Sequence, residues 1–455
     1  MNDSSSKSVW RDRALLIAIT LSSMLAPLNS TMIAVALPRL ITEFQTNVAH
    51  ASWLVTSYLI AMATLQPIAG KLGDRWGRRS LILGGLICFG GASLAATWAP
   101  TLEMLIGFRL LQAVSGAIAI PNGVALVREV VPDHQRATQF GLISSAISLA
   151  AAIGPPIGGV LTSLAGWRAI FFVNVLLILP ALLLGWWAFP RSKPSASSRP
   201  FDWGGSLLLA SVLASLAGFL SQMRQGGLPV SPGVAVAGVV ALMAALFVYE
   251  GRHPDPIIQL RFFRKRAFAA ANGAIALSNL AMYVTLLSLP IFLSERAGWM
   301  DSQIGFVLAA FSGLMIVGSP LGGRWADRWG RRIPTVAGLA LFTLGLLPLV
   351  IQAETVPLAF LLPGLAIAGS GMGASMAGLQ TSAIESLSPK EAGVAAGIFS
   401  TSRYLGSIVG SSILAGILSS SGNFHLVFWM VGSTAFLSVL VSLGLRDRPL
   451  SEAQS

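Results

Sequence analysis

The sequence predicts an all-α membrane protein with fourteen transmembrane helices. Three observations indicate this fold class: the composition, a series of long apolar runs, and the distribution of basic residues between those runs. Of the 455 residues, 54% are hydrophobic and 11% are charged, and the mean hydropathy is +0.73. Soluble domains carry about twice that charged fraction. A chain this apolar could not cover its own surface in water, whereas lipid is a suitable solvent for it.

The apolar runs have the length of about 20 residues that a bilayer-spanning helix needs. Gly and Pro occur inside several of them, which membrane helices tolerate. The first run is longer than the apolar core of a signal peptide, so we expect a retained helix. The expected spans are Ala14–Leu37, Ser52–Leu72, Ser80–Trp98, Leu102–Val127, Thr138–Leu164, Ala169–Phe189, Trp203–Met223, Pro232–Tyr249, Phe268–Phe292, Ser302–Gly322, Ile333–Ile351, Pro357–Ile384, Ala392–Ser419 and Phe424–Leu445.

The basic residues fix an orientation for these spans. If the N-terminus is cytoplasmic, twenty-four Lys and Arg residues fall at inner loops and termini. Only four, Arg39, Arg168, Arg224 and Arg296, fall at outer loops. This asymmetry predicts that both termini are cytoplasmic. It also supports the number of spans, because one missed helix would invert every later loop. The net charge of +12 therefore reflects membrane topology, and no nucleic-acid partner is expected.

A ten-residue segment occurs twice. Residues 70–79 (GKLGDRWGRR) and residues 323–332 (GRWADRWGRR) match at seven of ten positions. Each copy follows the second span of a six-span set on the inner side, and such internal repeats are common in secondary transporters. The offset of 253 residues leaves room for two extra helices between the sets. We therefore expect an N-terminal six-helix bundle at 1–190, a linker with two extra helices at 191–255, and a C-terminal six-helix bundle at 256–455.

The repeated segments, together with further motifs, resemble the major facilitator superfamily, and more narrowly its fourteen-helix drug:proton antiporters. Arg109 lies in a stretch that resembles the helix 4 signature, and GPPIGG at 154–159 resembles the helix 5 signature of exporters. The resemblance covers about residues 14–445. It implies the major facilitator fold: two six-helix bundles plus two extra helices between them. It also implies alternating-access export of amphiphilic small molecules, such as drugs, across the bacterial inner membrane, linked to the proton gradient.

The resemblance also assigns two structural motifs. The repeated loops are expected to act as conformational latches, and the helix 5 glycines are expected to allow tight packing against the opposite bundle. The latch residues are Gly70, Asp74, Arg75, Gly77, Arg78, Gly323, Asp327, Arg328, Gly330 and Arg331. The helix 5 residues are Gly154, Pro155, Gly158 and Gly159.

The sequence departs from the family pattern at Asn29. The family usually carries a proton-linked aspartate there, and an amide does not titrate. All eighteen carboxylates fall near span ends or in loops, whereas Arg109 and Arg403 fall inside spans. A cavity with positive charge and no acidic partner favours a neutral or anionic amphiphile. Two alternatives stay open: a facilitator or lipid or organic-anion exporter without proton antiport, and a non-transporting sensor.

Polar and aromatic residues within the expected central helices are the candidate substrate and coupling residues. Intramembrane charges are by default functional, and buried polar groups in lipid need partners. The candidates are Asn29, Thr31, Trp53, Thr56, Tyr58, Gln66, Arg109, Gln112, Asn122, Asn279, Tyr283, Gln380, Arg403 and Tyr404.

Other chemistries are not expected. The chain has one cysteine, Cys88, and its four histidines are far apart and near span ends. The sequence therefore predicts no disulfide framework, no metal site, no cofactor and no membrane-embedded hydrolase. The expected partners are the substrate and membrane lipid, and a monomer is expected.

Overall fold

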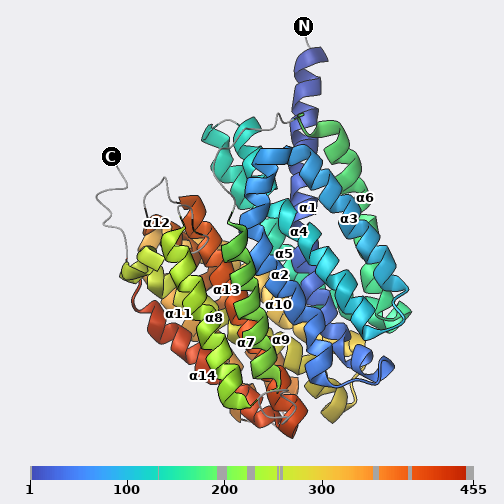
Figure 1. Cartoon of the computed structure of the whole chain (residues 1–455), viewed down its shortest axis with the longest axis vertical. Coiled ribbons are helices and arrows are strands. Elements are labelled where there is room, and N and C mark those ends of the chain that lie inside the picture. Colours follow the sequence, from blue (N-terminus) through green and yellow to red (C-terminus); the bar gives the residue numbers. More distant parts are fainter. Residues whose placement is uncertain are drawn as a thin grey trace.

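The computed structural model describes residues 3–131, 133–191, 202–222, 231–253, 256, 260–351, 358–387 and 392–446. Within these ranges the chain forms helices and connecting turns and contains no strand (Figure 1). The α-helices are α1 (Asp3–Glu43), α2 (Val48–Trp76), α3 (Arg78–Thr97), α4 (Leu102–Val130), α5 (Asp133–Ala165), α6 (Arg168–Ala188), α7 (Trp203–Gln222), α8 (Pro232–Arg252), α9 (Arg266–Ala297), α10 (Asp301–Trp329), α11 (Arg332–Ile351), α12 (Leu358–Glu385), α13 (Ala392–Ser421) and α14 (Phe424–Ser442). A short 3₁₀ helix, η1 (Leu260–Arg264), precedes α9.

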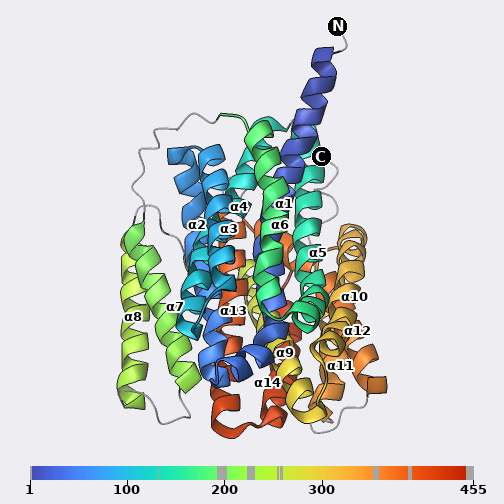
Figure 2. The same cartoon turned by 90° about the vertical axis from the view of Figure 1, so that its right-hand side faces the viewer.

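The fourteen helices run roughly along one axis, and both chain ends lie at the same end of the molecule (Figures 1 and 2). We call this end the terminal face and the opposite end the far face. Each expected span corresponds to one helix, so the predicted all-α, fourteen-helix fold is confirmed. Most helix ends lie within a few residues of the expected bounds, but α1 begins well before Ala14 and α10 continues beyond Gly322 to Trp329. Among the described residues, twelve helices are long and apolar enough to cross a membrane, and α5 and α13 run beside them.

The helices pack as two groups with the same internal arrangement. In the first group, the N-half, α1 packs against α4, α5 and α6, and α3 packs against α4 and α6. In the second group, the C-half, α9 packs against α12, α13 and α14 in the same way, and α11 packs against α12 and α14. The two halves meet mainly through α5 with α10 and α2 with α13, which are equivalent pairs in this repeat.

Glycines set the close approach of helices at equivalent places in the two halves. A Cβ on Gly158 of α5 would stand 2.8 Å from the carbonyl oxygen of Met32 on α1. A Cβ on Gly410 of α13 would stand 3.0 Å from the carbonyl oxygen of Leu280 on α9. Small residues allow this backbone contact, which drives helix association in lipid.

The extra helices α7 and α8 form a hairpin beside the seam between the halves. α7 packs against α2 of the N-half and α13 of the C-half, and α8 packs mainly against α7 (Figure 2). Asp202 caps the start of α7, where its Oδ1 accepts a hydrogen bond of 2.7 Å from the backbone N–H of Gly205. Exposed apolar side chains cover much of α8, including Val236, Val240 and Phe247, as expected for a lipid-facing helix.

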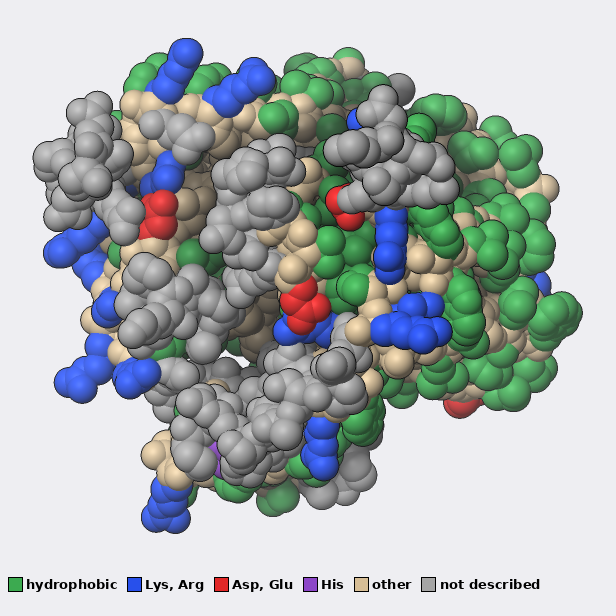
Figure 3. All heavy atoms as spheres, turned by 90° about the horizontal axis from the view of Figure 1, so that it is seen from above, with side chains coloured by type: hydrophobic (Ala, Val, Ile, Leu, Met, Phe, Trp, Pro, Cys, Tyr) green, Lys and Arg blue, Asp and Glu red, His purple; other side chains and the backbone are tan. Residues whose placement is uncertain are grey.

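Charge is distributed unevenly over the molecule. Lys and Arg side chains stand at many places around the terminal face, with few Asp or Glu side chains between them (Figure 3). The described repeat arginines lie at this end, where the turns after α2 and α10 are made by Gly77 (φ 88°) and Gly330 (φ 81°). These left-handed backbone angles favour glycine, so the repeat needs glycine at both positions.

Candidate functional site

A cavity of about 100 Å³ lies between the two halves at mid-depth. The two halves line it with equivalent helices of the repeat: α1, α2, α4 and α5 from the N-half, and α9, α10, α12 and α13 from the C-half. Three of the four tyrosines of the chain line this central cavity, namely Tyr58, Tyr283 and Tyr404. Four methionines, Met62, Met282, Met315 and Met376, also line it. Flexible thioethers and amphipathic rings suit a surface that adapts to several apolar ligands.

Polar contacts join the two halves around the cavity. The hydroxyls of Ser30 on α1 and Tyr283 on α9 share a hydrogen bond of 3.3 Å. Gln66 Nε2 on α2 donates a hydrogen bond of 3.3 Å to Tyr404 Oη on α13. Nearer the far face, the hydroxyls of Thr56 and Ser411 share a bond of 2.9 Å.

A buried polar network lies behind Tyr58 in the N-half. The guanidinium of Arg109 lies 4.1 Å from the ring centroid of Tyr58, in cation–π contact. Its Nε donates to the carbonyl oxygen of Leu54 at 3.1 Å, and its Nη1 donates to Gln112 Oε1 at 3.3 Å. Gln112 Nε2 in turn donates to Ser93 Oγ at 2.7 Å.

Asn29 completes this network with its donor group. Its Nδ2 donates a hydrogen bond of 3.1 Å to Gln112 Oε1, which already accepts from Arg109. The Nη2 of Arg109 and the Oδ1 of Asn29 are both buried without a hydrogen-bond partner among the described residues. An unpaired buried polar atom costs about 1–3 kcal/mol, so these two atoms are a local cost of the buried network.

The charge of the cavity is positive. Arg403 lines it from α13, with its guanidinium 5.1 Å from the ring centroid of Tyr404. No hydrogen bond or ion pair joins this guanidinium to another described residue. None of the described residues that line the cavity is Asp or Glu.

The structure brings together most of the candidate residues from the sequence. Six of them line the cavity: Thr31, Tyr58, Asn279, Tyr283, Arg403 and Tyr404. Asn29, Arg109 and Gln112 form the network behind it, and Gln66 and Thr56 join the halves beside it. Sequence reasoning missed Ser30, Ser312, Ser407 and the methionines, because single serines and methionines in apolar spans carry no distinctive pattern.

Three candidate residues lie elsewhere. Trp53 is half-buried, and its ring lies about 4.0 Å from where a Cβ on Gly218 of α7 would stand, so it faces the extra hairpin. Asn122 holds α4 against α2, since its Nδ2 donates to the carbonyl oxygen of Ala69 at 2.8 Å. Gln380 is exposed on α12.

The helix 5 glycines make two kinds of contact. Gly154 and Gly158 approach α1 of their own half, at Thr31 and Met32, and not the opposite bundle. Gly159 does meet the opposite bundle, because a Cβ on it would lie 2.8 Å from the Cα of Gly305 on α10. Gly159 therefore packs across the seam between the halves, as expected. Gly154 and Gly158 instead pack within the N-half.

The repeated loops contact their own halves in this conformation. Arg78 pairs with Glu129 at the end of α4. Arg331 pairs with Glu385 at the end of α12, with Nη2 to Oε1 at 3.0 Å and Nε to Oε2 at 3.3 Å. Arg75 and Arg328 are exposed. The side chains of Asp74 and Asp327 and the surroundings of Gly70 lie outside what the structure describes.

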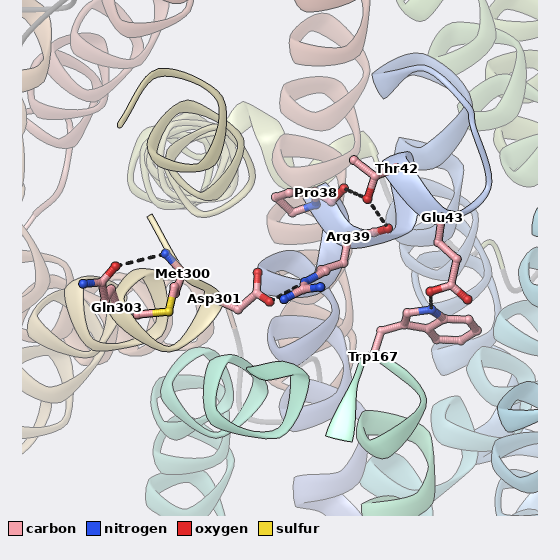
Figure 4. A network of polar contacts seen from close by, with 8 residues as sticks. All are labelled: Pro38, Arg39, Thr42, Glu43, Trp167, Met300, Asp301 and Gln303. Carbon is pink, nitrogen blue, oxygen red and sulfur yellow. Dashed lines mark hydrogen bonds and ion pairs between the residues drawn. The ribbon is translucent and has the colours of Figure 1, made fainter. Parts of the chain in front are cut away.

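At the far face an ion pair joins the two halves (Figure 4). Arg39 at the end of α1 donates from Nε to Asp301 Oδ2 at 2.7 Å, and Asp301 begins α10. The Asp301 side chain is 7% exposed, whereas that of Arg39 is 59% exposed. Beside this pair, Glu43 accepts from Trp167 Nε1 at 2.7 Å and from Arg168 Nη1 at 2.6 Å, entirely within the N-half. The Arg39–Asp301 pair therefore ties α1 to α10 at the far face.

Two bundles of equivalent membrane-length helices around a central cavity define a polytopic membrane transporter and not an enzyme. The chain belongs to the Major Facilitator Superfamily, whose sequence profile matches residues 19–253 and 271–455.

Relatives and a solved structure agree with this membership. The chain is 36% identical over 97% of its length to the uncharacterized MFS-type transporter YvkA of Bacillus subtilis, and covers 97% of that protein. It is 31% identical to the multidrug resistance protein Stp of Mycobacterium tuberculosis, over 89% of this chain and 75% of that one. A crystal structure of a bacterial homolog of the human lysosomal transporter Spinster, in an inward-facing and unoccupied conformation, shares the fold. Its TM-score is 0.65 at 17% identity, over 96% of this chain and 95% of that chain.

Proposed function

We propose that this protein exports amphiphilic small molecules across the bacterial inner membrane by alternating access. The observation that carries the proposal is the central cavity, which both halves line with equivalent helices, while the Arg39–Asp301 pair joins the halves at the far face. Relatives named as multidrug resistance proteins support export of drug-like compounds. The terminal face is the cytoplasmic side in this proposal, because basic residues gather there.

The two halves, α1–α6 and α9–α14, are the rocking bodies. In the conformation described, the polar contacts between them run from mid-depth to the far face: Gln66 with Tyr404, Ser30 with Tyr283, Thr56 with Ser411, and Arg39 with Asp301. Opening toward the outside breaks these contacts, and the repeated loops then latch the cytoplasmic side. This assignment of the loops comes from the family resemblance.

The substrate is a neutral or anionic amphiphile. Tyrosine rings and methionines provide apolar contact, while Arg403 adds a positive charge without a carboxylate beside it. A lipophilic cation would meet unscreened repulsion in this low-dielectric site. Export without proton antiport is the second candidate mechanism, and it is favoured by Asn29, whose amide occupies the position of the family's usual proton-linked aspartate.

The test uses bacteria lacking their own major efflux pumps. Cells with this protein should accumulate less of at least one neutral or anionic fluorescent amphiphile than cells with an empty vector. Tyr283→Ala should abolish the difference. Gln380→Ala, at an exposed position of α12 away from the cavity, should preserve it. No difference from the empty vector for any compound would contradict export, and a difference unaffected by Tyr283→Ala would contradict the cavity as the site. Strong resistance to quaternary ammonium compounds would contradict the substrate class.

A further inference from the structure

The distribution of charge through the molecule bears on how transport is driven. At mid-depth the described residues place two guanidinium groups, those of Arg403 in the cavity wall and Arg109 behind Tyr58. The described carboxylates lie elsewhere. Glu43, Glu103, Glu295 and Asp301 lie toward the far face, and Asp12, Glu129, Glu385, Asp202 and Glu250 lie toward the terminal face.

A proton antiporter needs a group that binds a proton on one side of the membrane and releases it on the other. In this cavity the tyrosines and arginines hold their protons at physiological pH, and Asn29 does not titrate. Asp301 is buried, yet it is paired with Arg39 at the far face and does not line the cavity. Among the described residues, the groups around the cavity therefore provide no proton carrier.

We propose that the protein exports an amphiphilic monoanion electrogenically, driven by the membrane potential and without proton exchange. This inference rests on the proposed export function and specifies its substrate class and driving force. Arg403 provides the recognition: its guanidinium is stacked on Tyr404, faces the cavity and has no ion-pair partner among the described residues. A sulfonate or carboxylate on a flat aromatic body satisfies both the guanidinium and the tyrosine rings.

The potential is a sufficient driving force for such a substrate. A bacterial interior is negative, so an anion that can cross is driven outward. One charge moved across 100 mV corresponds to about 2.3 kcal/mol, or roughly a 50-fold concentration ratio. A carrier for a monoanion therefore reaches useful gradients with no titratable group in its cavity, whereas a cation would be drawn inward by the same potential.

The experiment reconstitutes the purified full-length protein in liposomes with valinomycin-imposed potassium potentials. The anionic probe is 8-anilino-1-naphthalenesulfonate, and its matched neutral control is N-phenyl-1-naphthylamine, which has the same rings without the sulfonate. We expect an inside-positive potential of 100 mV to accumulate the sulfonate up to about 50-fold. A reversed potential, or a pH gradient without potential, should produce no accumulation. Protein-free liposomes give the passive background.

Variants link the effect to the cavity. Arg403→Gln should abolish accumulation of the sulfonate, Arg403→Lys should preserve part of it, and Arg168→Gln, a far-face arginine within one half, should leave it unchanged. Accumulation of the anionic probe that follows the pH gradient instead of the potential would overturn the inference. Transport of N-phenyl-1-naphthylamine or ethidium, with no transport of the anionic probe, would also overturn it. In either case transport itself would be present, so the proposed export function would stand while the inference failed.

Discussion

Asn29 donates a hydrogen bond of 3.1 Å from Nδ2 to Oε1 of Gln112, and that oxygen also accepts from Arg109. Because two donors converge on one acceptor, the amide of Asn29 must present its NH₂ group there. An aspartate, which has no donor when ionised, would face Gln112 Oε1 with a second acceptor. The local network is therefore built for an amide, and the departure from the family's aspartate at this position is matched by its surroundings.

Asn29→Asp should reduce transport of an anionic amphiphile. The new carboxylate would lie in the network of Arg109 and neutralise part of the positive charge behind the cavity. We expect the initial rate for 8-anilino-1-naphthalenesulfonate to fall about tenfold, equivalent to about 1.4 kcal/mol. The rate for N-phenyl-1-naphthylamine should be unchanged in the same proteoliposomes. An unchanged rate for the sulfonate would show that the network does not contribute to anion binding.

Arg109→Met should leave stability nearly unchanged while anion transport falls. The methionine removes a buried cation that has no carboxylate partner among the described residues, and Gln112 Oε1 still accepts from Asn29. Replacing buried charge by an apolar side chain of similar length is often neutral or stabilising. Thermal unfolding in detergent is the measurement. Arg109→Ala is the contrasting variant, since the void left under Tyr58 should destabilise it by about 2–4 kcal/mol. Equal destabilisation by both variants would mean that the guanidinium itself stabilises the fold.

Gly158→Val and Gly410→Val should each disrupt packing in their own half. A Cβ at these positions would stand 2.8 Å and 3.0 Å from backbone carbonyl oxygens of α1 and α9. Backbone cannot move aside as a flexible side chain can, so the helices must separate. We expect reduced yield of folded protein and lower unfolding temperatures. Gly84→Val on α3 is the control, because nothing lies within 4 Å of a Cβ there. Native-like stability of the Gly158 variant would contradict the close approach of α1 and α5.

The helices, their approximate bounds and the two-fold repeat could be predicted from the sequence, because lipid imposes span length and the repeat GxxxDRWGRR marks equivalent places. Arg109, Tyr283 and Arg403 were identifiable for a similar reason, since polar groups inside apolar spans need partners. The side of the helix on which each residue lies was not predictable. Trp53 and Gln380 lie on helices that also carry cavity residues, but Trp53 faces α7 and Gln380 is exposed.

Asp74→Asn should reduce transport while leaving membrane insertion intact. The prediction follows from the family role of the repeated loop, whose neighbouring arginine pairs with Glu129 inside its own half in this conformation. We expect the variant to reach the membrane at normal levels and to show slower efflux of a transported fluorescent amphiphile. Glu103→Gln, an exposed carboxylate at the start of α4, is the control. Normal transport by the Asp74 variant would remove the latch assignment.

Asp301→Asn should shift the protein toward opening at the far face. The Arg39–Asp301 ion pair joins α1 to α10 across the seam, and loss of a partly exposed pair costs about 1 kcal/mol, which corresponds to a several-fold change in population. The measurement is the distance distribution between spin labels on cysteines at Gln45 and Gln303, two exposed far-face positions. Only Cys88 needs prior replacement, because it is the single cysteine of the chain.

Glu43→Gln distinguishes a tie across the seam from general loosening of the far face. Glu43 accepts from Trp167 and Arg168, so its contacts stay within the N-half. Because it lies beside Arg39 (Figure 4), its neutralisation disturbs the same surface without cutting the link between α1 and α10. We expect longer label distances for Asp301→Asn and unchanged distances for Glu43→Gln. If both variants lengthen the distances equally, the ion pair has no special role, and closure must depend on the backbone contact of Gly159 with Gly305.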